Sequence, residues 1–451
     1  MQSQFVLLRD RRFLPLFITQ FLGAFNDNLL KAFIVVLVAY GQWDIGTMRP
    51  DVLVSLAAAL FILPFIVFCP IAGDLTDKFD KAKIIKATKI LEVVIAFMAV
   101  FTIYQGSITL AFFVLFLLGV QSAFFSPGKF SILPQLLSSN ELIGANGLMS
   151  TGTYLAILSG TIIGTLFALN AYGAEIISTI LMLCALAGFF ASCKIPSAPS
   201  ANPDKHISLN PFGAIYSTLR YTLTMKHGVL AAILATSWFY FVAGTIHTQF
   251  PNFAKQSLGV DTDVLTMFMV IFSLGIAVGG LLNNKLLKSV ISGRLVPWAA
   301  LMIVVFSADL YFASTAYFSA RSPLDLGGGD LASGEAFDTI SIFFSNIHAW
   351  RIVADLFLLS LAGGLYVVPL RAIVQDRSPK ENTSRVVAGN SLSDSLFLLL
   401  SSLFGAALLS LGWLVKDLFL MLSIMTLIVA IMLFRHKEIY TRQNHGQSNI
   451  D

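Results

Sequence analysis

Charged residues are scarce in this chain. Only 12% of its 451 residues are Asp, Glu, Lys or Arg, whereas 56% are hydrophobic and the mean hydropathy is +0.80. A soluble domain carries about 25% charged and roughly 45–50% apolar residues. Too few polar side chains remain to cover a water-facing surface of this size. The composition therefore argues against a soluble globular enzyme and against a disordered chain.

Cysteine and histidine are also rare. The chain has three cysteines and six histidines, and neither set shows the spacing of a disulfide framework or a zinc site. A Gly-x-Ser-x-Gly nucleophile elbow and a clustered His/Asp pair are both missing, which argues against a lipase or acyltransferase. The net charge of +4 is small and dispersed, so no nucleic acid partner is expected. We predict neither catalytic residues nor a bound metal or cofactor.

Long apolar runs, by contrast, are abundant. A helix needs about 20 apolar residues to cross a bilayer, and charged residues, Pro and Gly divide the chain into twelve runs of this kind. They cover residues 13–40, 52–72, 84–104, 109–126, 145–169, 174–193, 229–250, 264–282, 295–318, 351–370, 386–411 and 416–434. The sequence therefore predicts an all-α polytopic membrane protein with twelve transmembrane helices.

The basic residues alternate between the connecting segments. If the N-terminus is cytoplasmic, most of the 29 lysines and arginines fall in cytoplasmic segments, as the positive-inside rule requires. The outer segments hold only Arg49, Lys255, Arg321 and Lys416. One span too many or too few would destroy this alternation. We expect a multi-pass protein with both termini in the cytoplasm.

The spans divide into two groups of six. A polar, proline-containing segment at 194–228 separates residues 1–193 from residues 229–451. A weak repeat supports duplication, because Pro127-Gly-Lys129 closes the fourth span and Pro369-Leu-Arg371 closes the tenth. We therefore predict two pseudo-symmetric six-helix halves joined by a cytoplasmic linker.

One outer loop, residues 320–350, is unusually long. It contains Gly327–Gly329 and several acids, followed by Ile340, Phe343, Phe344 and Ile347 at helical spacing. This pattern is typical either of a short helix in the outer membrane interface or of a cap over the outer mouth.

The first span contains the sharpest polar feature. Asn26, Asp27, Asn28 and Lys31, here called the first-span cluster, lie near its middle. An ionisable side chain there costs at least a few kcal/mol unless it is paired or lines a wet cavity. Asp27 and Lys31 are four residues apart, so they share a helix face and are able to pair. The cluster either holds helices together or binds a substrate head group, a coupling cation such as Na+ or H+, or both.

Other candidates lie in later spans. Gln121 lies in the fourth span, Asp394 lies among serines in the eleventh, and Trp238 begins an aromatic block in the seventh. Further intramembrane acids are Glu92, Asp309 and Asp355. The acids suit interhelical hydrogen bonding or transport. The aromatic block suits lipid-facing packing or an acyl-chain channel.

The segment after the second span carries a motif. Gly73-Asp-Leu-Thr-Asp77-Lys78 and the lysines that follow resemble the signature loop of the major facilitator superfamily, with Asp80 in place of the usual glycine. An acid at a helix start is favoured by the positive end of the helix dipole and is able to pair with basic residues of the other half. We interpret Gly73, Asp77 and Lys78 as a cytoplasmic latch.

Several blocks resemble the lysophospholipid transporter (LplT) family within that superfamily. They are Gln20–Lys31, Gln121–Lys129 with Ile132-Leu-Pro134, Glu141–Gly147, Ser237-Trp-Phe, Gln249–Lys255 and Gly363–Pro369. The resemblance covers essentially the whole chain. It implies inward movement of lysophospholipids across a bacterial inner membrane, for reacylation in the cell. Because the chain has no His-x-x-x-x-Asp motif, an acyltransferase or acyl-carrier-protein synthetase would be a separate partner.

These inferences predict a transporter that works by alternating access among membrane lipids. The two halves would rock about a central site that a lysophospholipid enters from the outer leaflet. Lys31 would face its phosphate, Asp27 an ammonium or coupling cation, and Lys129 and Arg371 would receive the phosphate near the inner mouth. Two alternatives remain: a major facilitator transporter of another amphipathic or drug-like solute, and a non-transporting scaffold for a lipid-remodelling enzyme.

Overall fold

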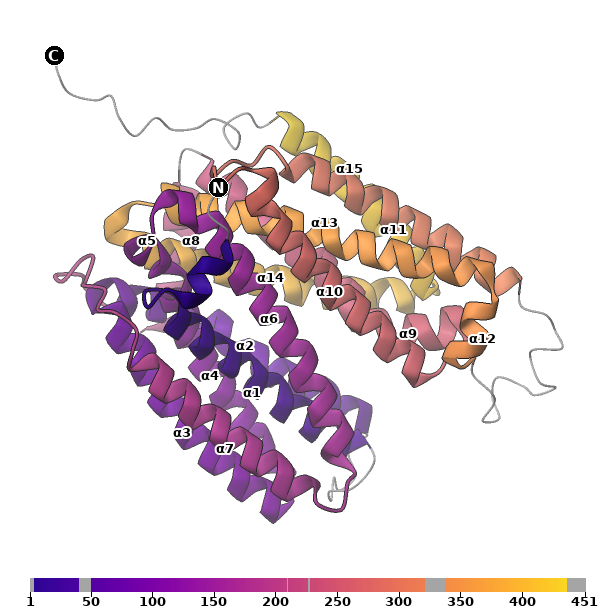
Figure 1. Cartoon of the computed structure of the whole chain (residues 1–451), viewed down its shortest axis with the longest axis horizontal. Helices are drawn as coiled ribbons and strands as arrows, with labels where there is room; N and C mark the ends of the chain where they lie inside the picture. The colour runs from indigo at the N-terminus through magenta and orange to yellow at the C-terminus, as the bar shows by residue number, and fades with distance from the viewer. Residues whose placement is uncertain (1–3, 40–49, 209, 226–227, 321–337, 436–451) are drawn as a thin grey trace. The chain divides into compact units, whose positions relative to one another are not determined.

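The computed structural model describes residues 4–39, 50–208, 210–225, 228–320 and 338–435 (Figure 1). These residues are almost entirely helical, as the apolar runs predict. Among them, extended backbone pairs at an isolated bridge between Val260 and Asp338.

The first part of the chain forms six long helices. They are α1 (Leu14–Ala39), α2 (Pro50–Lys78), α3 (Lys81–Gln105), α4 (Ile108–Ser131), α6 (Ser139–Ala168) and α7 (Gly173–Ser192). Shorter helices accompany them, namely η1 (Gln4–Arg9), α5 (Leu133–Leu136) and, in the linker, α8 (Pro211–Leu223).

The second part also forms six long helices. They are α9 (Val229–Asn252), α10 (Thr262–Leu286), α11 (Val296–Ser319), α13 (Ile347–Arg377), α14 (Thr383–Ser410) and α15 (Val415–Arg435). The shorter elements here are η2 (Phe253–Leu258), α12 (Ile340–Ser345) and η3 (Lys380–Asn382).

Each predicted span corresponds to one long helix. In the described residues, eleven of these helices are long and apolar enough to cross a membrane. The remaining long helix, α3, has 25 residues and carries Lys89 and Glu92 in its interior. Large apolar side chains also stand exposed on the helix surfaces, among them Phe97 on α3 at 63%, Leu166 on α6 at 68% and Phe190 on α7 at 62%. Such side chains suit contact with lipid.

Several helices extend beyond the apolar runs that predicted them. The run at 52–72 continues as α2 to Lys78, and the run beginning at 145 is preceded by the first turns of α6 from Ser139. Apolar composition marks only the part of a helix that fits the hydrocarbon, whereas helical hydrogen bonding continues until a cap stops it. Ser138 and Glu141 form the capping box that begins α6.

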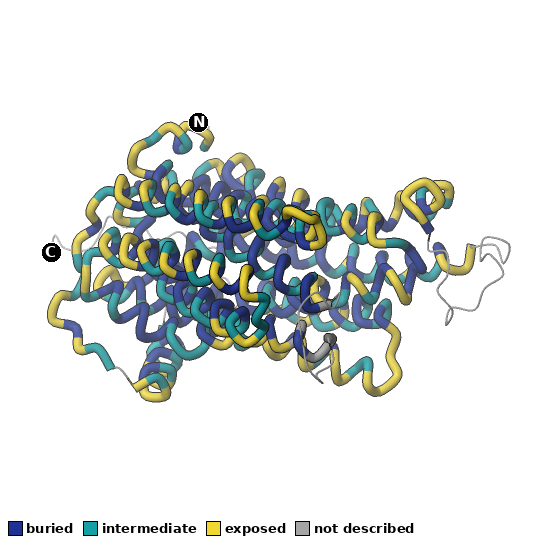
Figure 2. Tube along the Cα trace, turned by 90° about the horizontal axis from the view of Figure 1, so that it is seen from below, coloured by how far each residue is buried: buried dark blue, intermediate teal, exposed yellow. Residues whose placement is uncertain are grey.

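The chain divides into two compact units. Unit 1 contains Met1–Lys226 together with Val374–Leu396, and unit 2 contains His227–Ile373 together with Phe397–Asp451. The end of α13 and the first half of α14 therefore pack within unit 1. In both units buried residues follow the helix sides that face neighbouring helices (Figure 2).

Close helix packing in unit 1 uses small residues. A Cβ on Gly160 of α6 would lie 2.5 Å from the carbonyl oxygen of Phe25 on α1. The two backbones therefore approach to a distance that only glycine allows, as is common between membrane helices. This contact fixes α6 against the turn of α1 that begins the first-span cluster.

The outer loop is only partly described. Residues 321–337, including Gly327–Gly329, lie outside the described residues. The expected helix is six residues long, and Phe343 within it is fully buried, with its ring centroid 5.2 Å from that of Tyr317 and 5.6 Å from that of Phe268. The apolar helix face that was predicted to lie in the membrane interface thus contributes Phe343 to the core of unit 2.

Candidate functional site

The first-span cluster occupies one level of α1 in unit 1. Asp27, Asn28 and Lys31 are half-buried, whereas Asn26 is buried and donates to the carbonyl oxygen of Leu181 on α7 at 3.1 Å. Asn28 donates to the Ala24 carbonyl of its own helix at 2.8 Å. Asn26 therefore anchors α1 to α7, and the other three side chains keep partial access.

Asp27 and Lys31 do not form the direct pair that their spacing allows. The Asp27 carboxylate accepts a hydrogen bond of 2.7 Å from the hydroxyl of Ser122 on α4. The Lys31 ammonium lies over the ring of Phe61 on α2, 5.4 Å from its centroid. Each charge is thus held by a different neighbouring helix.

Gln121 precedes Ser122 on α4, and its side chain contacts α3. Its amide nitrogen donates to Glu92 at 3.0 Å and to the Thr88 carbonyl at 3.3 Å, and only 2% of the residue is exposed. Gln121 therefore belongs to a buried network between helices. Its buried position does not favour direct contact with a substrate.

The remaining intramembrane candidates pack with neighbours. Asp394 accepts from Asn390 one turn earlier on α14 at 2.7 Å. In unit 2, Trp238 stacks on Phe241 with centroids 5.1 Å apart, and its indole donates to Thr426 on α15 at 3.3 Å. Trp238 is therefore part of the packing between α9 and α15.

Lys129 and Arg371 are placed by aromatic rings in their own units. Lys129 lies 4.9 Å from the ring centroid of Phe130 and 5.6 Å from that of Phe125 in unit 1. Arg371 donates to the hydroxyl of Tyr240 in unit 2, and its guanidinium carbon lies 5.7 Å from the centroid of that ring. Both cations are held at defined positions near helix ends.

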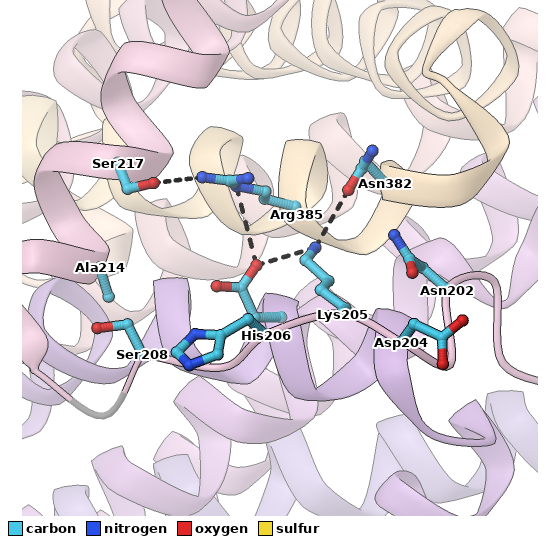
Figure 3. A pocket seen from close by; sticks show the side chains of 10 residues that line it. Asn202, Asp204, Lys205, His206, Ser208, Ala214, Ser217, Asn382 and Arg385 are labelled. Atoms are coloured by element: carbon cyan, nitrogen blue, oxygen red, sulfur yellow. Dashed lines mark hydrogen bonds and ion pairs between the residues drawn. The ribbon is translucent and has the colours of Figure 1, made fainter.

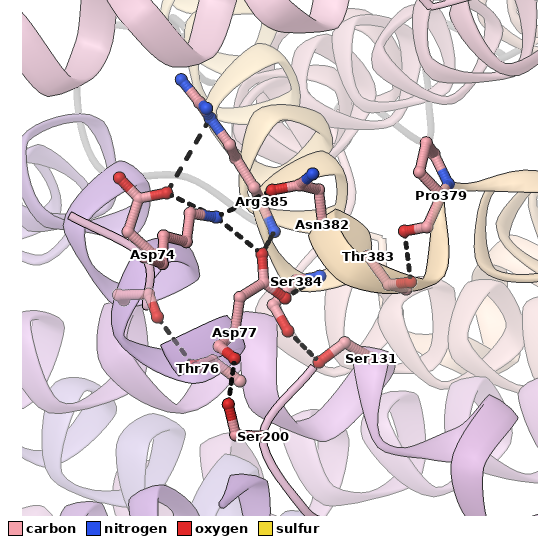
Figure 4. A network of polar contacts seen from close by, with 12 residues as sticks. Asp74, Thr76, Asp77, Ser131, Ser200, Pro379, Asn382, Thr383, Ser384 and Arg385 are labelled. Carbon is pink, nitrogen blue, oxygen red and sulfur yellow. Dashed lines mark hydrogen bonds and ion pairs between the residues drawn. The ribbon is translucent and has the colours of Figure 1, made fainter. Parts of the chain in front are cut away.

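The predicted latch is helical where the sequence suggested a loop. Gly73–Lys78 forms the last turns of α2, and only Phe79 and Asp80 separate α2 from α3. Figure 4 shows Asp74 and Asp77 of these turns beside Ser384 and Arg385 of α14. Asp77 thus lies at the end of its own helix. The motif continues the helix because no residue in it caps or breaks the backbone hydrogen bonds.

The Asp77 side chain contacts the start of another helix, α14. Its two carboxylate oxygens accept from the backbone N–H groups of Ser384 at 2.8 Å and Arg385 at 3.0 Å. A Cβ on Gly73 would lie 2.5 Å from the Cβ of Ala388, so glycine lets α2 approach α14. A fully buried carboxylate therefore caps the positive end of α14.

Lys205, a cation of the linker, lies at the centre of this network and was not among the residues expected from the sequence. Its ammonium lies 2.9 Å from both Asp74 and Asp77 and donates to Asn382 at 3.2 Å. Lys205 is one of three lysines in the polar, proline-containing segment 194–228, and no local pattern distinguishes it from the other two. We call Asp74, Asp77, Lys205, Asn382, Ser384 and Arg385 the α2–α14 network.

A polar pocket of about 430 Å³ lies beside this network (Figure 3). Its cations are already engaged: Lys205 pairs with both acids, and Arg385 donates to Ser217 at 2.5 Å and lies 4.6 Å from the ring centroid of Tyr221. Ser217 and Tyr221 belong to α8, so the linker helix is tied to α14. The pocket is therefore a junction of charged partners and not an open anion site.

Asp80 holds the linker to the start of α3. Its carboxylate accepts from the backbone N–H of Ala82 at 2.8 Å and from the hydroxyl of Ser197 at 2.5 Å. Partial burial would raise the pKa of Asp80, but the hydrogen bonds from Ser197, Ala198, Lys83 and Ala82 outweigh it and hold the pKa below its usual value. The residue that departs from the superfamily glycine is thus an N-cap.

Metal-ligating side chains are not gathered in the described ranges. No group of three or more His, Cys, Asp or Glu residues there is placed to hold a metal ion.

Comparison with known proteins identifies the family. The family described as transmembrane secretion effector matches residues 47–332. The lysophospholipid transporter LplT of Cronobacter sakazakii is 25% identical over 395 residues, which cover 86% of this chain and 84% of that protein. LplT of Escherichia coli O1:K1 is 26% identical over 383 residues, which cover 83% and 82%.

Solved structures show the same fold. The human organic anion transporter MFSD10 superposes with a TM-score of 0.71 at 14% identity, covering 94% of this chain and 99% of that chain. The Escherichia coli fucose:proton symporter FucP superposes with a TM-score of 0.65 at 13% identity, covering 98% and 100%. The predicted twelve-helix major facilitator fold is confirmed. The chain belongs to the transmembrane secretion effector family of the major facilitator superfamily, and it is a multi-pass membrane transporter, not an enzyme.

Proposed function

We propose that this transporter moves lysophospholipids across a bacterial inner membrane, or between its leaflets, by alternating access. The observation that carries the proposal is the half-buried pair of opposite charges, Asp27 and Lys31, at one level of α1. A lysophosphatidylethanolamine head carries a phosphate and an ammonium, which match Lys31 and Asp27 respectively. LplT relatives along most of the chain support the same substrate class.

The separate anchoring of the two charges favours a head group between them. Asp27 is held by α4 and Lys31 by α2, so neither charge neutralises the other in a direct bond. An amphipathic zwitterion satisfies both charges at once, while its acyl chain stays against apolar walls. Lys129 and Arg371 then serve as positions that receive the phosphate on release, and a separate acyltransferase reacylates the product.

The α2–α14 network is, in this proposal, the latch of the transport cycle. With both termini in the cytoplasm, the end of α2 and the start of α14 lie on the cytoplasmic side. Asp77 caps α14 and binds Lys205 at the same time, so opening this side requires a buried carboxylate to lose its partners together. The network therefore sets the energy of one state of the cycle.

Export of another amphipathic solute is the second candidate. It is favoured by the description of the family as transmembrane secretion effectors. Competition against fluorescent lysolipid uptake separates the two candidates. Suppression by unlabelled lysolipids supports the lysolipid proposal, because it shows that lysolipids share the site of uptake. Stronger suppression by cationic or drug-like solutes than by lysolipids would favour the second candidate.

The test of the main proposal is uptake of fluorescent lysophosphatidylethanolamine into proteoliposomes, with sodium and proton gradients imposed separately. We expect Asp27→Ala and Lys31→Ala to reduce uptake by about tenfold or more, the factor that loss of roughly 1.4 kcal/mol produces. Asp263→Ala and Lys285→Ala, which change exposed charges at the two ends of α10, are the matched controls. Wild-type uptake in correctly inserted Asp27 and Lys31 variants would refute the site.

A further inference from the structure

Two buried charged residues on α3 have no part in the head-group site. The ammonium of Lys89 lies 2.5 Å from a carboxylate oxygen of Glu92, and the two side chains are 0% and 2% exposed. A buried ion pair contributes little net stability, because desolvation of the two charges offsets their attraction. A contribution to stability alone therefore explains this pair poorly.

The pair packs against the face of α1 that carries Asp27. A Cβ on Gly23 would lie 2.5 Å from the Lys89 ammonium, so this ammonium packs closely against α1 at Gly23. Gly23 and Asp27 are four residues apart and share that face. On the other side, the Lys89 ammonium lies 5.0 Å from the ring centroid of Phe125 on α4. The Lys89–Glu92 pair thus lies buried between α1, α3 and α4.

A series of polar contacts within hydrogen-bonding distance joins the pair to Asp27. Glu92 accepts from the amide nitrogen of Gln121 at 3.0 Å. The amide oxygen of Gln121 lies 3.2 Å from the Ser122 hydroxyl, which also lies 2.7 Å from Asp27. The order is therefore Lys89, Glu92, Gln121, Ser122, Asp27, and we call it the α3–α1 relay.

Ser122 is the switch point of the relay. Its hydroxyl has one proton and two acceptors, the Asp27 carboxylate and the Gln121 amide oxygen, so a bond to one weakens the bond to the other. An ammonium or a proton on Asp27 would weaken this carboxylate as an acceptor and so favour the hydrogen bond from Ser122 to Gln121. Both acids also keep one buried oxygen with no hydrogen-bond partner among the described residues, Asp27 Oδ1 and Glu92 Oε1.

We propose that Lys89, Glu92 and Gln121 are positioning residues that report the occupancy of Asp27 to α3 through Ser122. The inference rests on the proposed function, in which Asp27 binds the cationic part of the substrate. The pair fixes Gln121, and Gln121 competes with Asp27 for the Ser122 proton. The relay therefore controls the transport step more than the binding of substrate.

Uptake kinetics test this role. Gln121→Leu and the double variant Lys89→Met/Glu92→Met, which keeps the net charge, should each lower the maximal rate by about tenfold while the KM for lysolipid changes by less than about threefold. Ser122→Ala should behave likewise, and Ser122→Thr, which keeps the hydroxyl, should restore the rate. Ser178→Ala on α7 removes a buried hydroxyl outside the relay and is the matched control. Wild-type rates in the relay variants, or no restoration by threonine, would overturn the relay.

A second measurement is independent of the substrate. The rate at which dicyclohexylcarbodiimide labels Asp27, located by mass spectrometry, should rise in Ser122→Ala, because the carboxyl loses its donor. It should fall in Gln121→Leu, because Ser122 then donates to Asp27 alone; each change should be about threefold, in the range of one hydrogen bond. Changes of the same sign, or none, would refute the relay. Opposite changes without lysolipid uptake would refute the proposed function and leave the relay standing.

Discussion

At the scale of single residues, Asp80 fixes the start of α3. Two backbone N–H groups of α3 and one hydroxyl of the linker converge on its carboxylate. Sequence comparison with the superfamily pattern marks this position only as a departure from glycine. The structure explains the role of Asp80 at this position, since a glycine has no side chain that could cap α3 and accept a hydrogen bond from Ser197.

The cap predicts a pH-dependent contribution to stability. Asp80→Ala should destabilise the protein by about 1 kcal/mol, the typical value for loss of an N-cap. Because the pKa of Asp80 is lowered by folding, this contribution is present above the unfolded carboxyl pKa of about 3.9 and is lost as the pH falls through the lower folded pKa. Melting temperatures of wild type and variant at pH 7 and under acid check this.

The control for Asp80 is a neighbouring exposed acid. Asp204→Ala, in the same linker, should leave the melting temperature at pH 7 nearly unchanged. A difference between wild type and Asp80→Ala that stays constant below pH 3.9 would contradict the cap.

At the scale of elements, one carboxylate joins three segments. Asp77 at the end of α2 caps α14, and its side chain also binds Lys205 of the linker. The backbone carbonyl of Asp77 accepts from the N–H groups of Ala201 and Asn202 at 3.1 and 3.0 Å. The end of α2 is therefore satisfied by the linker, and the start of α14 by the end of α2.

This arrangement predicts coupling between Asp77 and Lys205. Asp77→Asn and Lys205→Met should each lower stability, and the double variant should lose less than the sum of the two by about 1 kcal/mol or more, because each single change leaves a buried charge with fewer partners. A double-mutant cycle from unfolding in detergent measures the difference. The matched control is Lys78→Met, on the neighbouring residue, whose effect should add to that of Asp77→Asn; additivity in the Lys205 cycle would refute the coupling.

At the scale of the whole molecule, the basic residues predict how the chain is oriented in the membrane. The eleven apolar helices and α3 give the chain many crossings, and the alternation of basic residues predicts which connections face the cytoplasm. Asn170 lies between α6 and α7 and Asp204 lies after α7, and both are exposed. The two positions are thus separated by one helix and should lie on opposite sides of the membrane.

Cysteine labelling tests the orientation. With Cys69, Cys184 and Cys193 replaced, a membrane-impermeant maleimide should label Asn170→Cys in intact cells and Asp204→Cys only after permeabilisation, because the basic residues predict a cytoplasmic linker. The reverse pattern would invert the topology. Labelling of both positions in intact cells would show that α7 does not cross the membrane.

The helical class, the twelve long helices and the level of α1 that carries the charges are all readable from the amino-acid order. These features follow from hydropathy and from residue spacing, which are local properties. The partner of each polar group, by contrast, is known only from the packed helices. Asp77 caps a helix whose first residues lie 307 and 308 positions away, and Gln121 turns to Glu92 at a separation of 29. Such partners are selected by packing between helices, which no local pattern of residues encodes.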